Sequence, residues 1–260
     1  MKYIIFLTFC FTFLTAKTQR IADSLSYDNI KSYYQENADF FIEYNEADSI
    51  WHMFETKKGS GPFTEALKKE IIKEGNYFEY DMDKRIVIYG SYVNNKEDAI
   101  FIYFDSFGKV KRTTHFIKGK LNGQAKNYYS NGQLRLSQDY KKGLKHGEIL
   151  GFYIDGTRLF TGKYKKDKMI GQRMYFDVKG NPANGEMTWR HENGSTKLTG
   201  KCVNGMPEGR FTHYDEKGVV TLQVDYTRGL PNGAYIKYKN GVVEYKECYI
   251  LGKHTLRKCL

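Results

Sequence analysis

The residue types that most often carry catalysis or bind metals are scattered along this chain. Six histidines stand apart from one another, at His52, His115, His146, His191, His213 and His254. No two of them form the His-x-x-x-His pair of the metalloprotease motif. The sequence therefore predicts no metal site and no catalytic histidine.

Phosphate-binding and nucleophile motifs are also missing from the sequence. The glycine-rich stretch Lys58–Pro62 lacks the eight-residue frame of a phosphate loop and its Lys-Ser/Thr ending. No serine lies in a Gly-x-Ser-x-Gly elbow. We therefore expect a protein that is not an enzyme and that needs no cofactor.

The first 19 residues resemble a secretory signal peptide. Lys2 is followed by an apolar run from Tyr3 to Thr15, which is short for a membrane span, and then by Ala16. We expect cleavage near Ala16 and export to the periplasm, the outer membrane or the medium; an uncleaved anchor is the alternative.

Cleavage would remove Cys10 and leave three cysteines in an oxidising compartment, namely Cys202, Cys248 and Cys259. Their number is compatible with one disulfide and one free thiol, and their sequence does not fix the pairing. Their spacing does not match a zinc site, so we expect structural roles.

Lysine is the one chemically active residue type that recurs with a period. The recurring lysines flank glycines in successive 24-residue units and are Lys118, Lys120, Lys141, Lys142, Lys145, Lys163, Lys165, Lys166 and Lys168. Stacked units would align them along one sheet edge, which could meet an acidic protein or anionic head groups. Export argues against nucleic acid. The same lysines could simply solubilise the edge and block strand pairing. Tyr129 and Tyr153 lie near this edge and suit a protein interface.

The element that must position the lysines is an internal repeat. Residues 116–139 read FIKGKLNGQAKNYYSNGQLRLSQD and residues 140–163 read YKKGLKHGEILGFYIDGTRLFTGK, with an aromatic, three glycines and an alternating strand in common. The same phase recurs from about Gly75 to the C-terminus, with an irregularity at 180–194 where either a strand is lost or Gly185 opens a new one. The pattern predicts an all-β protein, an elongated single-layer antiparallel array of β-hairpins.

The hairpin turns are predicted from glycine dipeptides. These are Asn131-Gly132, Asp155-Gly156, Asn193-Gly194, Lys217-Gly218 and Asn240-Gly241. Asn-Gly and Asp-Gly favour the positive φ angles of a type I′ turn, so we expect two-residue type I′ loops at these sites. After each glycine, alternate residues are apolar, which predicts one apolar face.

The region 20–74 carries no visible repeat and is expected to be partly helical. The clearest helix is TEALKKEIIKE at 64–74, with Thr64 as the N-cap and Gly75 after its end. The preceding aromatics, including Trp51, should be buried against the repeat sheet; a solvated linker with one docked helix is the alternative. Residues 20–99 hold 10 Lys/Arg and 16 Asp/Glu, whereas residues 100–260 hold 29 and 14. The acidic region therefore complements the basic repeat domain at 75–260.

The run Y-x-x-G-x-x-x-G, followed by an aromatic residue and N-G-x-L, resembles the MORN repeat of the bacterial YwqK-like antitoxin group. The resemblance covers residues 92–252, and more weakly 75–91, with the best units beginning at Phe116, Tyr140 and Tyr226. It implies a β-hairpin array that mediates protein contacts, sometimes proposed to bind phospholipid, with no catalytic residues. Asn95, Ala99 and Asp167 depart from its glycine positions, which puts the local turn geometry in question.

Together these features predict an exported, non-enzymatic scaffold that binds a protein partner at the cell envelope. The alternatives are a binder of anionic membrane surfaces that works through the lysine-rich edge, and an antitoxin-like protein that neutralises a partner.

Overall fold

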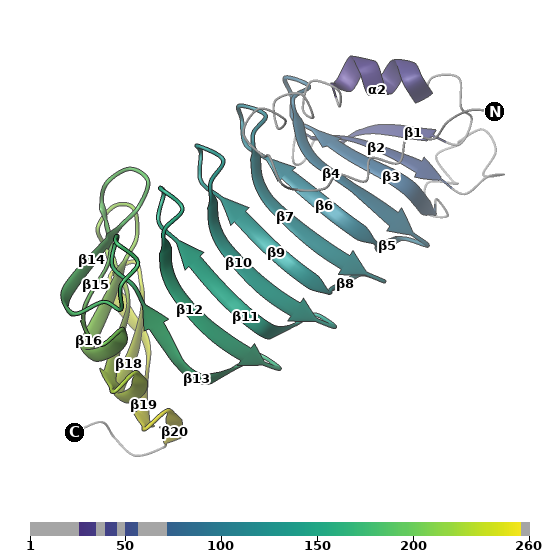
Figure 1. The fold of residues 1–260 in the computed structure, drawn as a ribbon. Coiled ribbons are helices and arrows are strands. Elements are labelled where there is room, and N and C mark those ends of the chain that lie inside the picture. The colour runs from purple at the N-terminus through teal and green to yellow at the C-terminus, as the bar shows by residue number, and fades with distance from the viewer. Residues whose placement is uncertain (1–25, 35–39, 46–49, 57–71, 256–260) are drawn as a thin grey trace. The chain divides into compact units, whose positions relative to one another are not determined.

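The computed structural model describes residues 26–34, 40–45, 50–56 and 72–255. This part is an all-β fold with one short helix, and its strands form two antiparallel sheets, neither of which closes (Figure 1). The chain divides into two units. The first unit consists of the chain up to Leu121 together with the short segment Ser130–Gly132. The second unit consists of Asn122–Tyr129 and of the chain from Gln133 onward.

The first unit is a succession of hairpins. Helix α2 (Tyr27–Tyr34) precedes strands β1 (Phe40–Asn45), β2 (Ile50–Thr56), β3 (Lys73–Tyr80), β4 (Ile86–Val93), β5 (Lys96–Glu97), β6 (Ala99–Phe104), β7 (Val110–Ile117) and β8 (Lys120–Leu121). Their order in the sheet is β1-β2-β3-β4-β6-β7, with β5 on β4 and β8 on β7. Almost every strand therefore pairs with its neighbour in the sequence.

The region before Gly75 contains more strand than the sequence suggested. Strand β1 pairs with β2, and β2 pairs with β3, so the sheet begins well before the predicted boundary. The predicted helix at 64–74 lies mostly outside the described residues. For its last two residues the prediction was wrong, because Lys73 and Glu74 begin strand β3. Aromatic and β-branched residues are dense in β1 and β2, and such residues favour strands.

A buried aromatic side chain of helix α2 packs against the sheet. Tyr27 is 4% exposed, and its ring meets the rings of Trp51 on β2 and Tyr80 on β3 edge to face, each with centroids 5.5 Å apart. The Lys84 ammonium lies 4.8 Å from the same ring centroid. Trp51 thus lies in the sheet and contributes to the packing of the helix.

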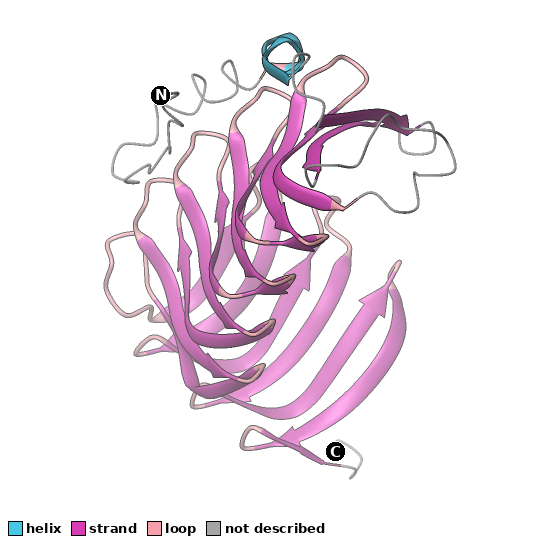
Figure 2. Cartoon of the chain, turned by 90° about the vertical axis from the view of Figure 1, so that its right-hand side faces the viewer, coloured by secondary structure: helices cyan, strands magenta, loops and turns pink. Residues whose placement is uncertain are grey.

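The second unit contains two groups of strands, which follow each other in the sequence (Figure 1). Figure 2 shows in magenta that strands make up most of the described chain. The first group is β9 (Gly123–Tyr128), β10 (Leu134–Lys141), β11 (Leu144–Phe152), β12 (Arg158–Lys165) and β13 (Lys168–Tyr175). The second is the seven-stranded sheet of β14 (Gly185–Arg190), β15 (Thr196–Val203), β16 (Met206–Tyr214), β17 (Val220–Thr227), β18 (Leu230–Lys239), β19 (Val242–Ile250) and β20 (Lys253–Thr255). The irregularity at 180–194 is the place where the second sheet begins, and Gly185 opens its first strand.

The core of the second unit lies where β13 meets the seven-stranded sheet. Tyr175, Trp189, Leu198, Cys202 and Phe211 are buried together. Burial alternates along β15, where Leu198, Gly200 and Cys202 are buried but Thr199 and Lys201 are not. Trp189 on β14 lies opposite Leu198. The alternating apolar face expected from the sequence therefore forms this core.

Glycines within strands make room for aromatic rings on the neighbouring strand. A Cβ atom at Gly200 would lie 2.5 Å from the ring of Phe211, and one at Gly151 would lie 2.2 Å from the ring of Phe160. In the first unit, Gly90 and Phe101 have the same relation, at 2.5 Å. These rings lie against glycine backbone, and a larger side chain would have to displace them.

The turns at one end of the hairpins differ from the prediction. In the loop after β11, Tyr153 N–H donates to Thr157 O at 2.8 Å, and Gly156 N–H donates to Tyr153 O at 3.0 Å. Gly156 has a positive φ, but Asp155 does not. This geometry fits a three-residue loop with a glycine bulge, and it recurs at Gly180, Gly194 and Gly218. The type I′ prediction was therefore wrong there, whereas Asn240 and Gly241 both have positive φ angles.

Two-residue turns with two positive φ angles lie instead at the opposite end of the hairpins. They are Asn94-Asn95, Lys118-Gly119, Lys142-Gly143, Lys166-Asp167, Asn204-Gly205, Arg228-Gly229 and Leu251-Gly252. Asn95 and Asp167 keep the geometry that glycine supplies elsewhere, because their side chains accept the N–H groups of Lys73 and Lys145. Ala99 also holds a positive φ, of 65°. Departures from the glycine pattern thus leave these backbones unchanged.

Each of several two-residue turns is hydrogen-bonded to the start of the preceding hairpin. Arg228 N–H donates to the Glu208 carboxylate at 2.8 Å, and Gly229 N–H donates to Pro207 O at 2.8 Å. The first of these bonds has counterparts about 20 residues apart: Asn94 to Glu74, Lys118 to Asp98, Lys142 to Asn122, Asn204 to Asn184, and Leu251 to Asn232. We call these contacts turn clips. They satisfy turn donors that strand pairing leaves free.

We predict that Gly200→Ala destabilises the protein by about 1–3 kcal/mol, the usual range for overpacking a filled core. The new methyl group would meet Phe211, which is 1% exposed and cannot move away from Tyr175 and Trp189. Urea unfolding followed by tryptophan fluorescence measures the change. Thr188→Ala, at an exposed position of β14, is the control and should change stability by less than about 0.5 kcal/mol. Equal stability of Gly200→Ala and the wild type would contradict this packing.

Candidate interaction surface

The second unit brings several of the predicted lysines together at adjacent turns. Lys142 lies in the turn between β10 and β11, Lys166 lies in the turn between β12 and β13, and Asp167 N–H donates to Lys145 O at 3.0 Å. Lys141, Lys142, Lys165, Lys166 and Lys168 are exposed. The repeated turn geometry therefore gathers positive charge at one end of these strands.

The exposed lysines at these turns have no carboxylate partners among the described residues. Of the ion pairs found in the part of the chain that the structure describes, none includes these five residues. Lys163 reaches Glu148 at 4.0 Å, but both side chains are largely exposed, so the pair contributes little stability. Lys145 differs from the others because it is half-buried and its ammonium lies 5.3 Å from the ring centroid of Tyr164.

Apolar side chains are exposed among these lysines. Leu144 follows the first turn, and Met169 and Ile170 follow the second, with exposed fractions of 41%, 40% and 50%. We refer to the following residues as the turn surface: Lys141, Lys142, Leu144, Lys165, Lys166, Lys168, Met169 and Ile170. A protein interface typically combines an apolar centre with a polar rim, and the turn surface has both.

The remaining predicted lysines belong to the first unit. Lys118 and Lys120 are exposed at the turn between β7 and β8, where Lys118 N–H donates to the Asp98 carboxylate at 3.1 Å. This clip fixes the backbone and leaves the lysine side chain in solvent.

Tyr129 and Tyr153 use their hydroxyl groups inside the sheet. Tyr129 donates to Phe152 O at 2.7 Å, and Tyr153 donates to Phe176 O at 2.9 Å, in each case 23 residues further along the chain. Tyr153 also accepts from Trp189 Nε1 at 3.0 Å. Burial raises the pKa of both tyrosines. Both residues therefore connect successive hairpins and are only partly exposed. They lie at the end of the hairpins opposite to the lysine-bearing turns, and not near the lysine edge as expected.

A cationic cluster that the lysine pattern did not indicate lies on the apolar side of the same unit. Arg173 on β13 places its guanidinium carbon 4.5 Å from the ring centroid of Phe160. Its charge interacts with Tyr164, Tyr175 and Tyr226, and these tyrosines keep the pKa of Arg173 above its ordinary value despite burial. The sequence contained a signal for this position. The second residue after a strand-opening glycine is apolar and buried in other strands, at Ala125, Ile149 and Phe211. Arg173 occupies the corresponding position.

His213 shares this electrostatic environment. Burial, reinforced by the positive charges of Arg173 and Lys197, lowers the pKa of His213 to about 4. The imidazole is therefore neutral at pH 7. Among the described residues, no group of three or more His, Cys, Asp or Glu side chains could hold a metal ion.

The two described cysteines differ in state. Cys202 is a free thiol, completely buried on β15, and burial raises its pKa to about 11. Cys248 on β19 is disulfide-bonded. A thiol with such a pKa is a poor nucleophile at neutral pH, so Cys202 acts as a core residue.

Comparisons with known proteins do not assign a family. No family model matches the chain, and no curated protein matches it. Among solved structures, TarM is similar over 59% of this chain at 11% identity and a TM-score of 0.28, and a TarM point mutant from S. aureus gives 0.26. This chain spans only 26% of the length of TarM. A porin-like protein from Bacteroides uniformis matches 80% of this chain and 93% of its own length at 10% identity, with a TM-score of 0.19. Within the described ranges, no helix has the length and hydrophobicity needed to span a membrane.

We predict that Tyr153→Phe destabilises the protein by about 1–3 kcal/mol, because it leaves Trp189 Nε1 and Phe176 O without this hydroxyl. Thermal or urea unfolding measures the change. Tyr214→Phe is a matched control, since its hydroxyl makes only a 3.5 Å contact with Thr199, and it should have a smaller effect. Equal effects of the two substitutions would rule out the proposed role of the Tyr153 hydroxyl.

Proposed function

We propose that this chain is an exported, non-enzymatic scaffold of the MORN type, built from 24-residue hairpin units, and that it binds a protein partner at the cell envelope. The turn surface is the observation that carries the proposal. It combines lysines that form no ion pair within the described part of the chain with exposed apolar residues, on a backbone held by hydrogen bonds.

The repeated backbone geometry supports the unit length. Within the second unit, the turns at Lys142-Gly143 and Lys166-Asp167 are 24 residues apart, and so are those at Asn204-Gly205 and Arg228-Gly229. Repeat proteins present such turns as a ladder, in which one residue type at one unit position produces an extended surface. The lysines follow this rule in β10 to β13, and the signal-peptide-like N-terminus supports export.

The composition of the turn surface favours a partner with an acidic rim and an apolar centre. Charge complementarity accelerates association and selects partners, whereas buried apolar contacts supply most of the affinity. Leu144, Met169 and Ile170 would supply the apolar contacts, and the lysines would surround them with positive charge.

An anionic membrane surface is the second candidate, favoured by the same unpaired lysines. Basic residues near a membrane contribute about 1 kcal/mol each to binding anionic lipids, and salt screens this attraction. A protein partner held by apolar contacts would instead remain bound at high salt. Salt dependence therefore distinguishes the two candidates.

We predict that changing Lys141, Lys142, Lys165 and Lys166 to Glu weakens capture of the partner from envelope extract at least tenfold at low salt, because the rim charge is reversed. The measurement compares immobilised wild-type and variant chains at low and high salt, beside co-sedimentation with anionic and neutral vesicles. A protein retained by the wild type at high salt supports the scaffold. Retention of anionic vesicles alone supports the membrane role.

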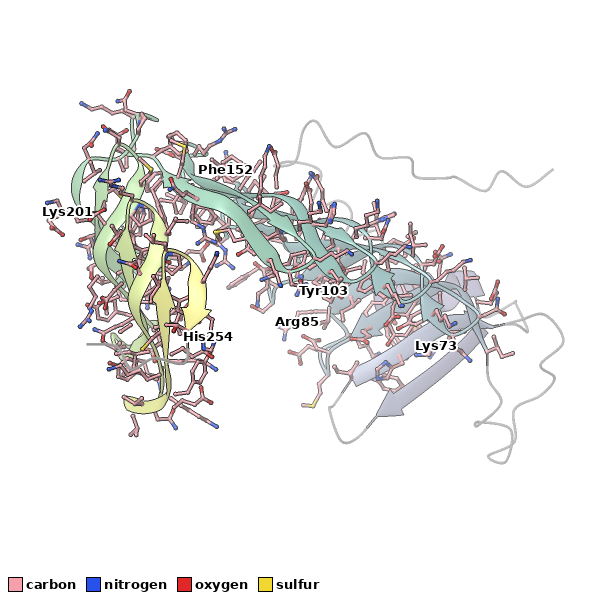
Figure 3. All side chains as sticks on the ribbon, turned by 90° about the horizontal axis from the view of Figure 1, so that it is seen from below. Lys73, Arg85, Tyr103, Phe152, Lys201 and His254 are labelled. Carbon is pink, nitrogen blue, oxygen red and sulfur yellow. The ribbon has the colours of Figure 1, made fainter. Side chains whose placement is uncertain are left out.

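The matched control changes Lys179, Lys201, Lys217 and Lys239 to Glu. These four are exposed in the second unit and lie outside the turn surface; Lys201 is labelled in Figure 3. The control has the same net charge as the variant and should bind as the wild type does. Equal losses in both variants would show that net charge, and not the turn surface, governs binding.

A further inference from the structure

Arg173 is a partly buried cation beside the apolar core of the second unit. It lies on β13 beside Tyr175, which belongs to the buried core, and its Nε atom is buried without a hydrogen-bond partner among the described residues. No carboxylate within the described residues forms an ion pair with it. A buried charge without a counter-charge is costly, so this arrangement calls for an explanation.

The groups around Arg173 are three tyrosines and a histidine, all of which can form hydrogen bonds. Tyr164 on β12, Tyr175 on β13 and Tyr226 on β17 are its electrostatic neighbours. Burial, as the largest cause, raises the pKa of Tyr226 far above its ordinary value, which keeps its hydroxyl protonated. His213 on β16 is uncharged at pH 7 and feels the charge of Arg173. Four strands therefore contribute polar groups to one place.

Aromatic rings form the walls of this place. The guanidinium lies over Phe160, whose ring centroid is 5.9 Å from that of Tyr175, and Tyr175 in turn lies 5.7 Å from Phe211. Phe211 contacts Tyr226 edge to face at 5.3 Å. Stacking on an aromatic ring fixes the plane of a guanidinium while its N–H edge stays available for a planar anion.

We propose that Arg173, with Tyr164, Tyr226 and His213, forms a binding site for an oxyanion, a carboxylate or phosphate group of a ligand. Arginine binds such groups through two parallel N–H···O bonds, and tyrosine hydroxyls and a neutral imidazole can donate to the remaining oxygens. Arg173 as a whole residue is partly exposed, so an anion can approach it from solvent. This site is separate from the turn surface and does not depend on the scaffold role.

The test is thermal unfolding of the mature chain, residues 20–260, titrated with sodium phosphate or sodium acetate against sodium chloride at equal ionic strength. A ligand that binds only the folded state raises the unfolding midpoint saturably, by about 2–4 °C for each kcal/mol in a chain of this size. We expect such a rise with at least one oxyanion and none with chloride. The stronger of the two responses identifies the ligand as a phosphate or a carboxylate.

Variants assign the response to Arg173. Arg173→Gln should abolish it, and Tyr226→Phe should weaken it several-fold. Arg158→Gln, at an exposed position on the adjacent strand β12, is the control and should keep it. Arg173→Lys is a second variant, which retains the positive charge but lacks the planar guanidinium. If Arg173→Gln does not fold, a loss of at least tenfold in the apparent anion affinity of Arg173→Lys leads to the same conclusion.

Two outcomes would overturn the proposal. One is a wild-type chain whose midpoint responds equally to phosphate, acetate and chloride. The other is a saturable response that persists in both Arg173 variants, which would place the anion elsewhere.

Discussion

Hydrogen bonds between each two-residue turn and the hairpin before it are the interactions on which the rest of the structure depends. At Arg228-Gly229, the two turn N–H groups donate to the Glu208 carboxylate and to Pro207 O. Strand pairing alone would leave these donors to water and would leave the ends of neighbouring hairpins free to separate. The clips join successive hairpins at the turn end, while the Tyr129 and Tyr153 hydroxyls join them at the opposite end in the second unit. Each hairpin is thus fixed by its neighbours.

The turn clips explain why the two-residue turns can carry different side chains. The clip uses only backbone N–H groups of the turn, so the side chains there are free to vary. They are Lys142 and Lys166 in one part of the second unit and Asn204 and Arg228 in another. Lysines at these positions therefore add charge to the surface without disturbing the sheet. Arg173 is the contrasting case, because its side chain lies on the apolar side, where packing normally requires Ala, Ile or Phe.

Much of the hairpin architecture could be predicted from the sequence, because glycines at fixed spacing and alternating apolar residues encode turns and faces directly. The turn types could not, since Asp155-Gly156 supports both a two-residue loop and a three-residue loop with a glycine bulge. The structure uses the second, with Tyr153 N–H bonded to Thr157 O. The start of a second sheet at Gly185 also depends on tertiary packing of Tyr175 against Trp189, which no local pattern contains. The lysine positions were predictable, but the apolar residues among them became evident only from their exposure.

Residue-resolved amide hydrogen exchange tests the central role of the turn clips most directly. The amides of Asn204, Gly205, Arg228 and Gly229 should exchange slowly, at rates like those of the strands, although these residues lie in two-residue turns. Val178 and Glu216, exposed in the loops at the opposite end, serve as references for fast exchange. Turn amides that exchange as fast as these references would contradict the account, because the hairpins would then be held by strand pairing alone.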